Sequence, residues 1–162
     1  MEEVQKIVGD QLTDFIRSRN EQAGTPEIDW QAKKNEWVRS VGELYAVVQA
    51  MLRDSVKSRD VTIRTINVEL TERFIGTYTI PVLELSVGGE RVEFRPKGIT
   101  IIGATGRVDV RGERDTVTLV NNAPNQKDGE WVVVLQRVPH LKMAQFDRES
   151  LKYVLERVML PV

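Results

Sequence analysis

The chain has 162 residues, of which 41% are apolar and 29% are charged, and its formal net charge is −1. This balance is typical of a globular domain and argues against a disordered chain or one held to nucleic acid or lipid by charge alone. The absence of cysteine excludes disulfides, thiolate metal sites and cysteine nucleophiles, and His140 is the single histidine. No apolar stretch approaches the ~20 residues that span a bilayer, and residues 1–6 do not read as a secretory signal.

The first predicted element is an amphipathic helix over residues 3–19. Its apolar residues recur at spacings of three and four, as one face of a helix requires. These residues are Val4, Ile7, Val8, Leu12, Phe15 and Ile16. Polar and cationic residues end the pattern, and a loop is expected to follow.

A second, longer helix is predicted from about Thr25-Pro26, with Asp29 as a rival cap, to about residue 59. Apolar residues on it repeat every seven positions, namely Trp30, Trp37, Leu44 and Met51, and Tyr45 widens the stripe. The stripe indicates packing against the first helix and a second surface. Alternatively, Trp30, Trp37 and Tyr45 face a partner, because aromatic residues are enriched in interface cores.

From Val61 the apolar period changes to two, which predicts strands. They are expected at residues 61–70, 77–87, 91–95, 100–102, 107–111, 116–120 and 131–138. Pro81 restricts the second strand to an edge or an irregularity, and a shift of apolar parity near Thr65-Ile66 predicts a bulge or a twist in the first. Gly88-Gly89 indicates a tight hairpin turn, and Asp147 is the expected cap of a closing helix.

These elements predict one α+β domain over residues 1–162. It comprises an N-terminal helical hairpin (1–59), a six- to seven-stranded antiparallel meander sheet (60–138) and a C-terminal helix (146–160) packed on the sheet. No helical pattern separates the predicted strands, so a parallel α/β fold is not expected.

The segment from Ile99 to Arg107 resembles the strand and glycine turn of dinucleotide-binding proteins only superficially. That motif needs a third glycine and a helix whose N-terminus meets the pyrophosphate. Here Asp109 occupies the third position, and the residues that follow alternate like a strand. The segment therefore favours a tight β-turn, and we expect no cofactor.

Acidic residues on the predicted strands could supply paired carboxylates or a magnesium site. They are Glu69, Glu72, Glu84, Glu93, Asp109 and Asp115. The lysine that a nuclease-like arrangement would place beside them is missing, which favours solvated strand acids. His140 lacks an identifiable orienting partner or nucleophile.

A cluster of basic residues is the second candidate surface. The segment from residue 91 to 114 has a surplus of three positive charges and includes Arg91, Arg95, Arg107 and Arg111. Alternation places Arg107, Asp109 and Arg111 on one face, which could contact phosphates or an acidic protein. Because acids are interleaved, cross-strand ion pairs on a solvated face are the competing interpretation.

The leading hypothesis from the sequence is a non-enzymatic protein-interaction module of the oligomerising, adaptor or immunity type. Its expected partner is another protein or a second copy. Nucleic-acid binding by the arginine-rich strands is the first alternative, and an acid- or metal-dependent hydrolase is the second. We expect a cytoplasmic protein without membrane association.

Overall fold

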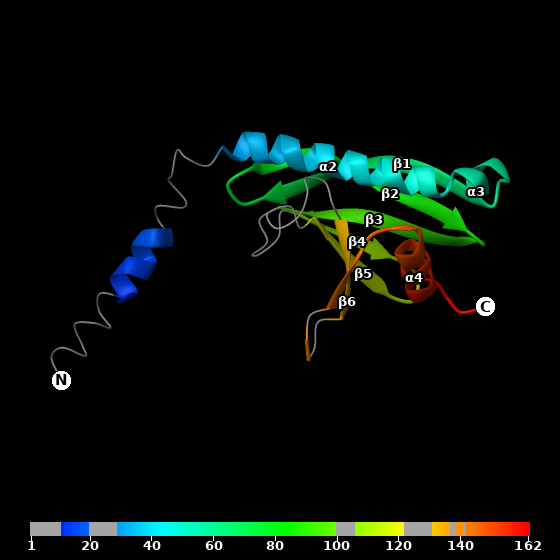
Figure 1. Ribbon diagram of the computed structural model, residues 1–162. Helices are drawn as coiled ribbons and strands as arrows, with labels where there is room; N and C mark the ends of the chain where they lie inside the picture. The colour runs from blue at the N-terminus through cyan, green and yellow to red at the C-terminus, as the bar shows by residue number, and fades with distance from the viewer. Residues whose placement is uncertain (1–10, 20–28, 100–105, 122–130, 137–138, 141) are drawn as a thin grey trace.

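The computed structural model describes residues 11–19, 29–99, 106–121, 131–136, 139–140 and 142–162. It has an α+β fold in which helices precede and follow a seven-stranded antiparallel sheet (Figure 1). The strands lie in chain order, so the sheet is a meander and the predicted fold class is confirmed. The expected strand at 100–102 and the turn at Gly103 lie outside the described residues.

The elements have the following bounds. The helices are α2 (Trp30–Met51), α3 (Arg53–Lys57) and α4 (Arg148–Val158). The strands are β1 (Val61–Glu72), β2 (Gly76–Val87), β3 (Glu90–Gly98), β4 (Arg107–Arg111), β5 (Thr116–Asn121), β6 (Trp131–Gln136) and β7 (Lys142–Gln145). The sequence pattern did not predict β7, which is short and half-polar.

Helix α2 begins after Asp29, which was the alternative to Thr25-Pro26 as the start of the predicted helix. The Asp29 side chain accepts a hydrogen bond from the Ala32 backbone N–H at 3.0 Å, so it satisfies one of the free N–H groups of the first turn. The helix ends at Leu52, where α3 continues the chain for one turn more. Its 22 residues span about 33 Å, so it crosses most of the molecule.

The change of apolar parity in β1 is a twist and not a bulge. Val61 and Ile63 pack towards the core at one end of the strand, and Val68 and Leu70 do so at the other. The pairing of β1 with β2 nevertheless runs without a break from Val61 to Glu72. The two-stranded ribbon must therefore rotate about its own axis between the two ends, as the right-handed twist of strands allows.

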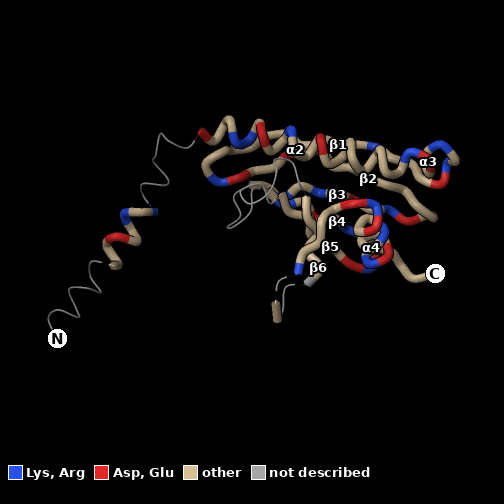
Figure 2. Tube along the Cα trace, viewed as in Figure 1, with Lys and Arg blue, Asp and Glu red and all other residues tan. Residues whose placement is uncertain are grey.

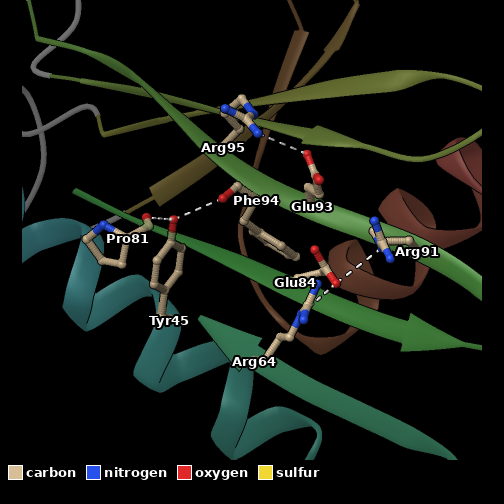
Figure 3. Close-up of polar contacts among 8 residues, drawn as sticks. All are labelled: Tyr45, Arg64, Pro81, Glu84, Arg91, Glu93, Phe94 and Arg95. Atoms are coloured by element: carbon tan, nitrogen blue, oxygen red, sulfur yellow. Dashed lines mark hydrogen bonds and ion pairs between the residues drawn. The ribbon is translucent and has the colours of Figure 1, made fainter. Parts of the chain in front are cut away.

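Two prolines end the pairing between β2 and β3. The last pair is Leu83 with Phe94, and two positions further on the same register would place Pro81 opposite Pro96. Neither proline has a backbone N–H to donate, so the ladder cannot continue there. Instead the Tyr45 hydroxyl of α2 lies 2.7 Å from the Pro81 carbonyl and 3.0 Å from the Phe94 carbonyl (Figure 3). The predicted irregularity at Pro81 is thus the point where the sheet divides.

The far end of the divided sheet is joined again by Glu72. Its carboxylate accepts hydrogen bonds from the Tyr78 hydroxyl and, at 2.7 Å, from the Ile99 backbone N–H. It also packs directly on Gly98, whose φ of +124° suits glycine and where a Cβ would collide with the carboxylate. The β1–β2 ribbon therefore contacts the end of β3 again beyond the division.

The hydrophobic core lies between the helices and one face of the sheet. Helix α2 packs on β2, and α4 packs on β4 and β5. From α2 the core receives Trp37, Val41, Leu44, Tyr45 and Val48. Trp37 lies beside Trp131, with ring centroids 6.0 Å apart, and against Gly106, where a Cβ would collide with the indole ring.

Helix α4 is fixed at both ends. At its start Asp147 and Ser150 form a capping box, in which each side chain accepts a hydrogen bond from the other's backbone N–H. Near its end Arg157 forms an ion pair of 2.9 Å with Asp115, and the Val158 carbonyl accepts a hydrogen bond from the β4–β5 turn. The closing helix packed on the sheet is confirmed.

The N-terminal helix (residues 11–19 in the described part) does not pack in the way that its pattern predicts. All of its described residues are exposed, including the apolar ones. Figure 1 shows this segment apart from α2 and the sheet.

Among the described residues, no helix is long and apolar enough to cross a membrane.

Candidate interaction surfaces

The aromatic residues of α2 belong mainly to the protein's own core. Trp37 is 2% exposed and Tyr45 is 4% exposed. Burial raises the pKa of the Tyr45 hydroxyl, against smaller lowering effects of the Leu83 backbone and Arg95. Trp30 is half-buried and stacks on Phe74 at the β1–β2 turn, with centroids 5.3 Å apart. Packing within the chain thus accounts for the stripe that could also have marked an interface.

The face of the sheet opposite the core carries arginines around buried acids. Glu84 is 4% exposed, and its Oε1 lies 2.9 Å from Arg64 Nε and 3.2 Å from Arg91 Nε (Figure 3). Arg64 comes from β1, Glu84 from β2 and Arg91 from β3, so this triad spans three strands. The acid is covered by the guanidinium groups of its neighbours.

A second buried acid lies further along the same face. Asp109 is 5% exposed and accepts two hydrogen bonds from Arg107, at 2.8 and 3.1 Å. The Thr118 hydroxyl adds a third at 3.1 Å from the neighbouring strand. Bidentate pairing of this kind fixes the guanidinium in place. Arg95, which faces Asp109 in the register, lies 3.5 Å from Glu93.

We call this surface the charged sheet face. It brings the four predicted arginines together, but neighbouring acids neutralise most of their charges. Arg91, Arg95 and Arg107 each have an acidic partner. Arg111 is exposed at the end of β4, opposite Glu93 and Thr116 in the register. Figure 2 shows the same mixture along the trace, where Lys and Arg alternate with Asp and Glu. The charges of both signs on this face largely cancel, so the surface is not strongly cationic.

The remaining predicted acids do not gather into a catalytic set. Glu72 is buried with Tyr78, while Glu69 on β1 and Asp115 in the β4–β5 turn are exposed. The Thr116 backbone N–H and Arg157 lower the pKa of Asp115. Burial and the Glu72 carboxylate raise the pKa of Tyr78. The described part of the chain holds no group of three metal-ligating side chains, and His140 is exposed.

An exposed apolar face lies on the N-terminal helix. Leu12, Phe15 and Ile16 are 60%, 58% and 51% exposed, and their spacing places them on one side of the helix. Arg19 lies at the end of the same side, with its guanidinium 5.2 Å from the centre of the Phe15 ring. This apolar face, ending in a cation, is presented to solvent.

A groove lies at the other end of the molecule, between the end of α2, the β2–β3 turn, α4 and residues 159–162. Its volume is about 1020 Å³. The lining is mainly apolar and includes Met51, Leu52, Val87, Leu155, Met159 and Leu160. Leu160 is one of the exposed large apolar residues of the chain. On the rim, Glu149 forms no ion pair with the described residues, whereas Lys152 is paired with Glu156 at 3.5 Å.

Sequence reasoning missed both the exposure of the N-terminal helix and the groove. The apolar period at Leu12, Phe15 and Ile16 indicated a buried face, and periodicity alone does not tell which surface covers it. The groove joins segments as distant as Met51 and Leu160, so no local pattern could reveal it.

The protein was compared with family models, curated proteins and solved structures, and none of the three comparisons found a match.

Proposed function

We propose that the protein is a non-enzymatic interaction module that binds another protein chain through the apolar face of its N-terminal helix. The observation that carries this proposal is the exposure of Leu12, Phe15 and Ile16, each more than half accessible on one side of the helix. Because each of these side chains is already about half covered, burying the rest of it against a partner stabilises the bound state by about 0.8–1.8 kcal/mol. Amphipathic helices that lie in an apolar groove are a common mode of protein recognition.

The charge of the helix favours a protein partner over a lipid surface. Its described charged residues are Asp14, Arg17 and Arg19, so this part of the helix carries one surplus positive charge. Helices that bind membrane surfaces have a polar side rich in lysine and arginine. A helix with one surplus charge gains little from anionic lipid, so apolar burial against protein is the better-supported mode.

The charged sheet face supports nucleic-acid binding less well. Phosphates would have to compete with Glu84 and Asp109, which already hold Arg91 and Arg107 at 3.2 and 2.8 Å. Affinity for nucleic acid should also fall steeply with salt, because phosphate contacts release counterions. Titration of labelled DNA and RNA at low salt tests this alternative, and tight binding that salt abolishes would revive it.

The test of the proposed function replaces the apolar face and leaves the rest of the helix intact. The variant is Leu12→Ser, Phe15→Ser and Ile16→Ser, and the matched control carries Asp14→Asn and Arg17→Gln on the other side. Binding is measured by sedimentation of the purified chain and by quantitative capture of proteins on the immobilised chain. We expect association in the wild type and the control and its loss in the triple variant. Equal behaviour of all three would refute the proposal.

A further inference from the structure

We infer that the groove beside α4 receives the N-terminal helix of a second copy of this chain, so that two copies exchange helices. The inference deepens the proposed function and rests on it. Its basis is that the chain carries both an exposed apolar helix face and an apolar groove. Binding of a second copy requires no other protein. Two identical exchanges of helices form a closed two-fold dimer.

The two surfaces match in chemistry. The helix offers Leu12, Phe15 and Ile16, and the groove offers an apolar lining that includes Leu155 and Leu160. The apolar face ends at Arg19, which stacks on Phe15 and whose guanidinium remains accessible to an acid. On the groove rim, Glu149 forms no ion pair with the described residues, and neither does Glu90, which instead accepts a hydrogen bond from the Leu160 backbone N–H. An ion pair between Arg19 and Glu149 would fix the direction in which the helix lies.

The other charges on the rim are mostly engaged. Arg148 donates a hydrogen bond of 2.8 Å to the Met51 carbonyl, which closes the end of α2. Glu90 accepts one of 2.9 Å from the Leu160 backbone N–H and holds the final segment in place. These contacts shape the groove and leave its apolar floor open.

The length of the connecting chain favours a second copy over the same chain. The groove begins at Met51, about 33 Å along α2 from Trp30. From Arg19 to Trp30 there are eleven Cα–Cα steps, which span at most about 36–40 Å when fully extended. A helix could reach the groove of its own chain only if this connection were stretched almost to its limit.

The test combines one variant on each surface. Phe15→Glu alters the helix, Leu160→Glu alters the groove at an exposed position, and Val56→Glu is the control at an exposed apolar residue of α3 outside the groove. In sedimentation velocity we expect the wild type and V56E to form dimers. F15E and L160E should each weaken the dimer at least about tenfold, because each places a charge in an apolar contact.

Mixing the two variants separates this arrangement from other dimers. F15E keeps an intact groove and L160E keeps an intact helix, so an equimolar mixture should form a heterodimer with one unaltered helix–groove contact, which is more stable than the dimer of either variant alone. A charge exchange provides a second measurement. Arg19→Glu and Glu149→Arg should each weaken the dimer, and the double variant should restore it.

Several outcomes would overturn the inference. A wild-type chain that stays monomeric refutes the exchange, and the proposed function then stands only if the triple serine variant loses another protein partner. A dimer that F15E weakens but L160E does not shows that the helix binds elsewhere, which refutes the groove and keeps the proposed function. A dimer that F15E leaves unchanged refutes the exchange, and it refutes the proposed function as well if the triple serine variant also loses nothing.

Discussion

Replacing Tyr45 with phenylalanine removes one hydroxyl group from the point where β2 and β3 separate. We expect the free energy of unfolding to fall by about 1–3 kcal/mol. The reason is local, because Pro96, which the register places opposite Pro81, has no N–H to pair with the Pro81 carbonyl. The Tyr45 hydroxyl supplies the donor that the ladder lacks.

The magnitude follows from burial and from the asymmetry of hydrogen bonding. Tyr45 is 4% exposed, and its hydroxyl oxygen lies 2.7 and 3.0 Å from the carbonyl oxygens of Pro81 and Phe94. A hydrogen bond contributes about 0.5–1.5 kcal/mol on balance, but a buried polar group left without a partner costs about 1–3 kcal/mol. Phenylalanine keeps the ring and its edge contact with Phe94, so little apolar packing is lost.

The assay is urea unfolding followed by circular dichroism and tryptophan fluorescence. Tyr153→Phe is the matched control, since Tyr153 lies on α4 and is 39% exposed. We expect it to change stability by less than about 0.5 kcal/mol, as surface substitutions usually do. If Y45F were as stable as the control, the hydroxyl would not serve the two carbonyls, and our explanation of the divided sheet would be refuted.

Three further substitutions test other parts of the fold. Because burial and Glu72 raise the pKa of Tyr78, the folded state holds this proton more tightly than the unfolded chain. Stability should therefore be full below pH 10 and fall above it by up to about 1.4 kcal/mol per pH unit, and Tyr78→Phe should flatten that slope in alkaline urea titrations. Asp147→Ala should cost about 0.5–2 kcal/mol by removing a cap, with Asp147→Asn costing less in the same assay. Gly106→Ala should cost about 1–3 kcal/mol by overpacking against Trp37, and a Trp37→Leu background should reduce that loss in calorimetry.

The parts of the fold that depend on local pattern could be predicted from the sequence. The seven-residue repeat from Trp37 to Met51 marked α2, and alternation marked the long strands. Asp147 was identified as a cap and Asp29 as the alternative to the Thr25-Pro26 start, because cap chemistry acts within one turn of the chain. Pro81 was identified as an irregularity because a missing N–H has the same effect in any sheet.

The parts that depend on contacts between distant segments could not be predicted. The structural effect of Pro81 depends on Pro96 and on the hydroxyl of Tyr45, which lies 36 residues away in α2. Glu84 looked like a solvated acid because nothing near it in sequence shows that Arg64 and Arg91 will cover it. Both arrangements are set by the register of the strands, which alternation alone leaves undetermined.

The division of the sheet also explains why a surface for association should lie outside α2. The β1–β2 ribbon and β3 separate, and the space between them has to be filled by large side chains. Tyr45 lies at this point and Trp37 is buried in the same core, so the aromatic residues that could have met a partner are used within the chain. The N-terminal helix carries the same kind of apolar face but has no described surface against it. Association is therefore expected to depend on Leu12, Phe15 and Ile16 and to be insensitive to exposed substitutions on α2.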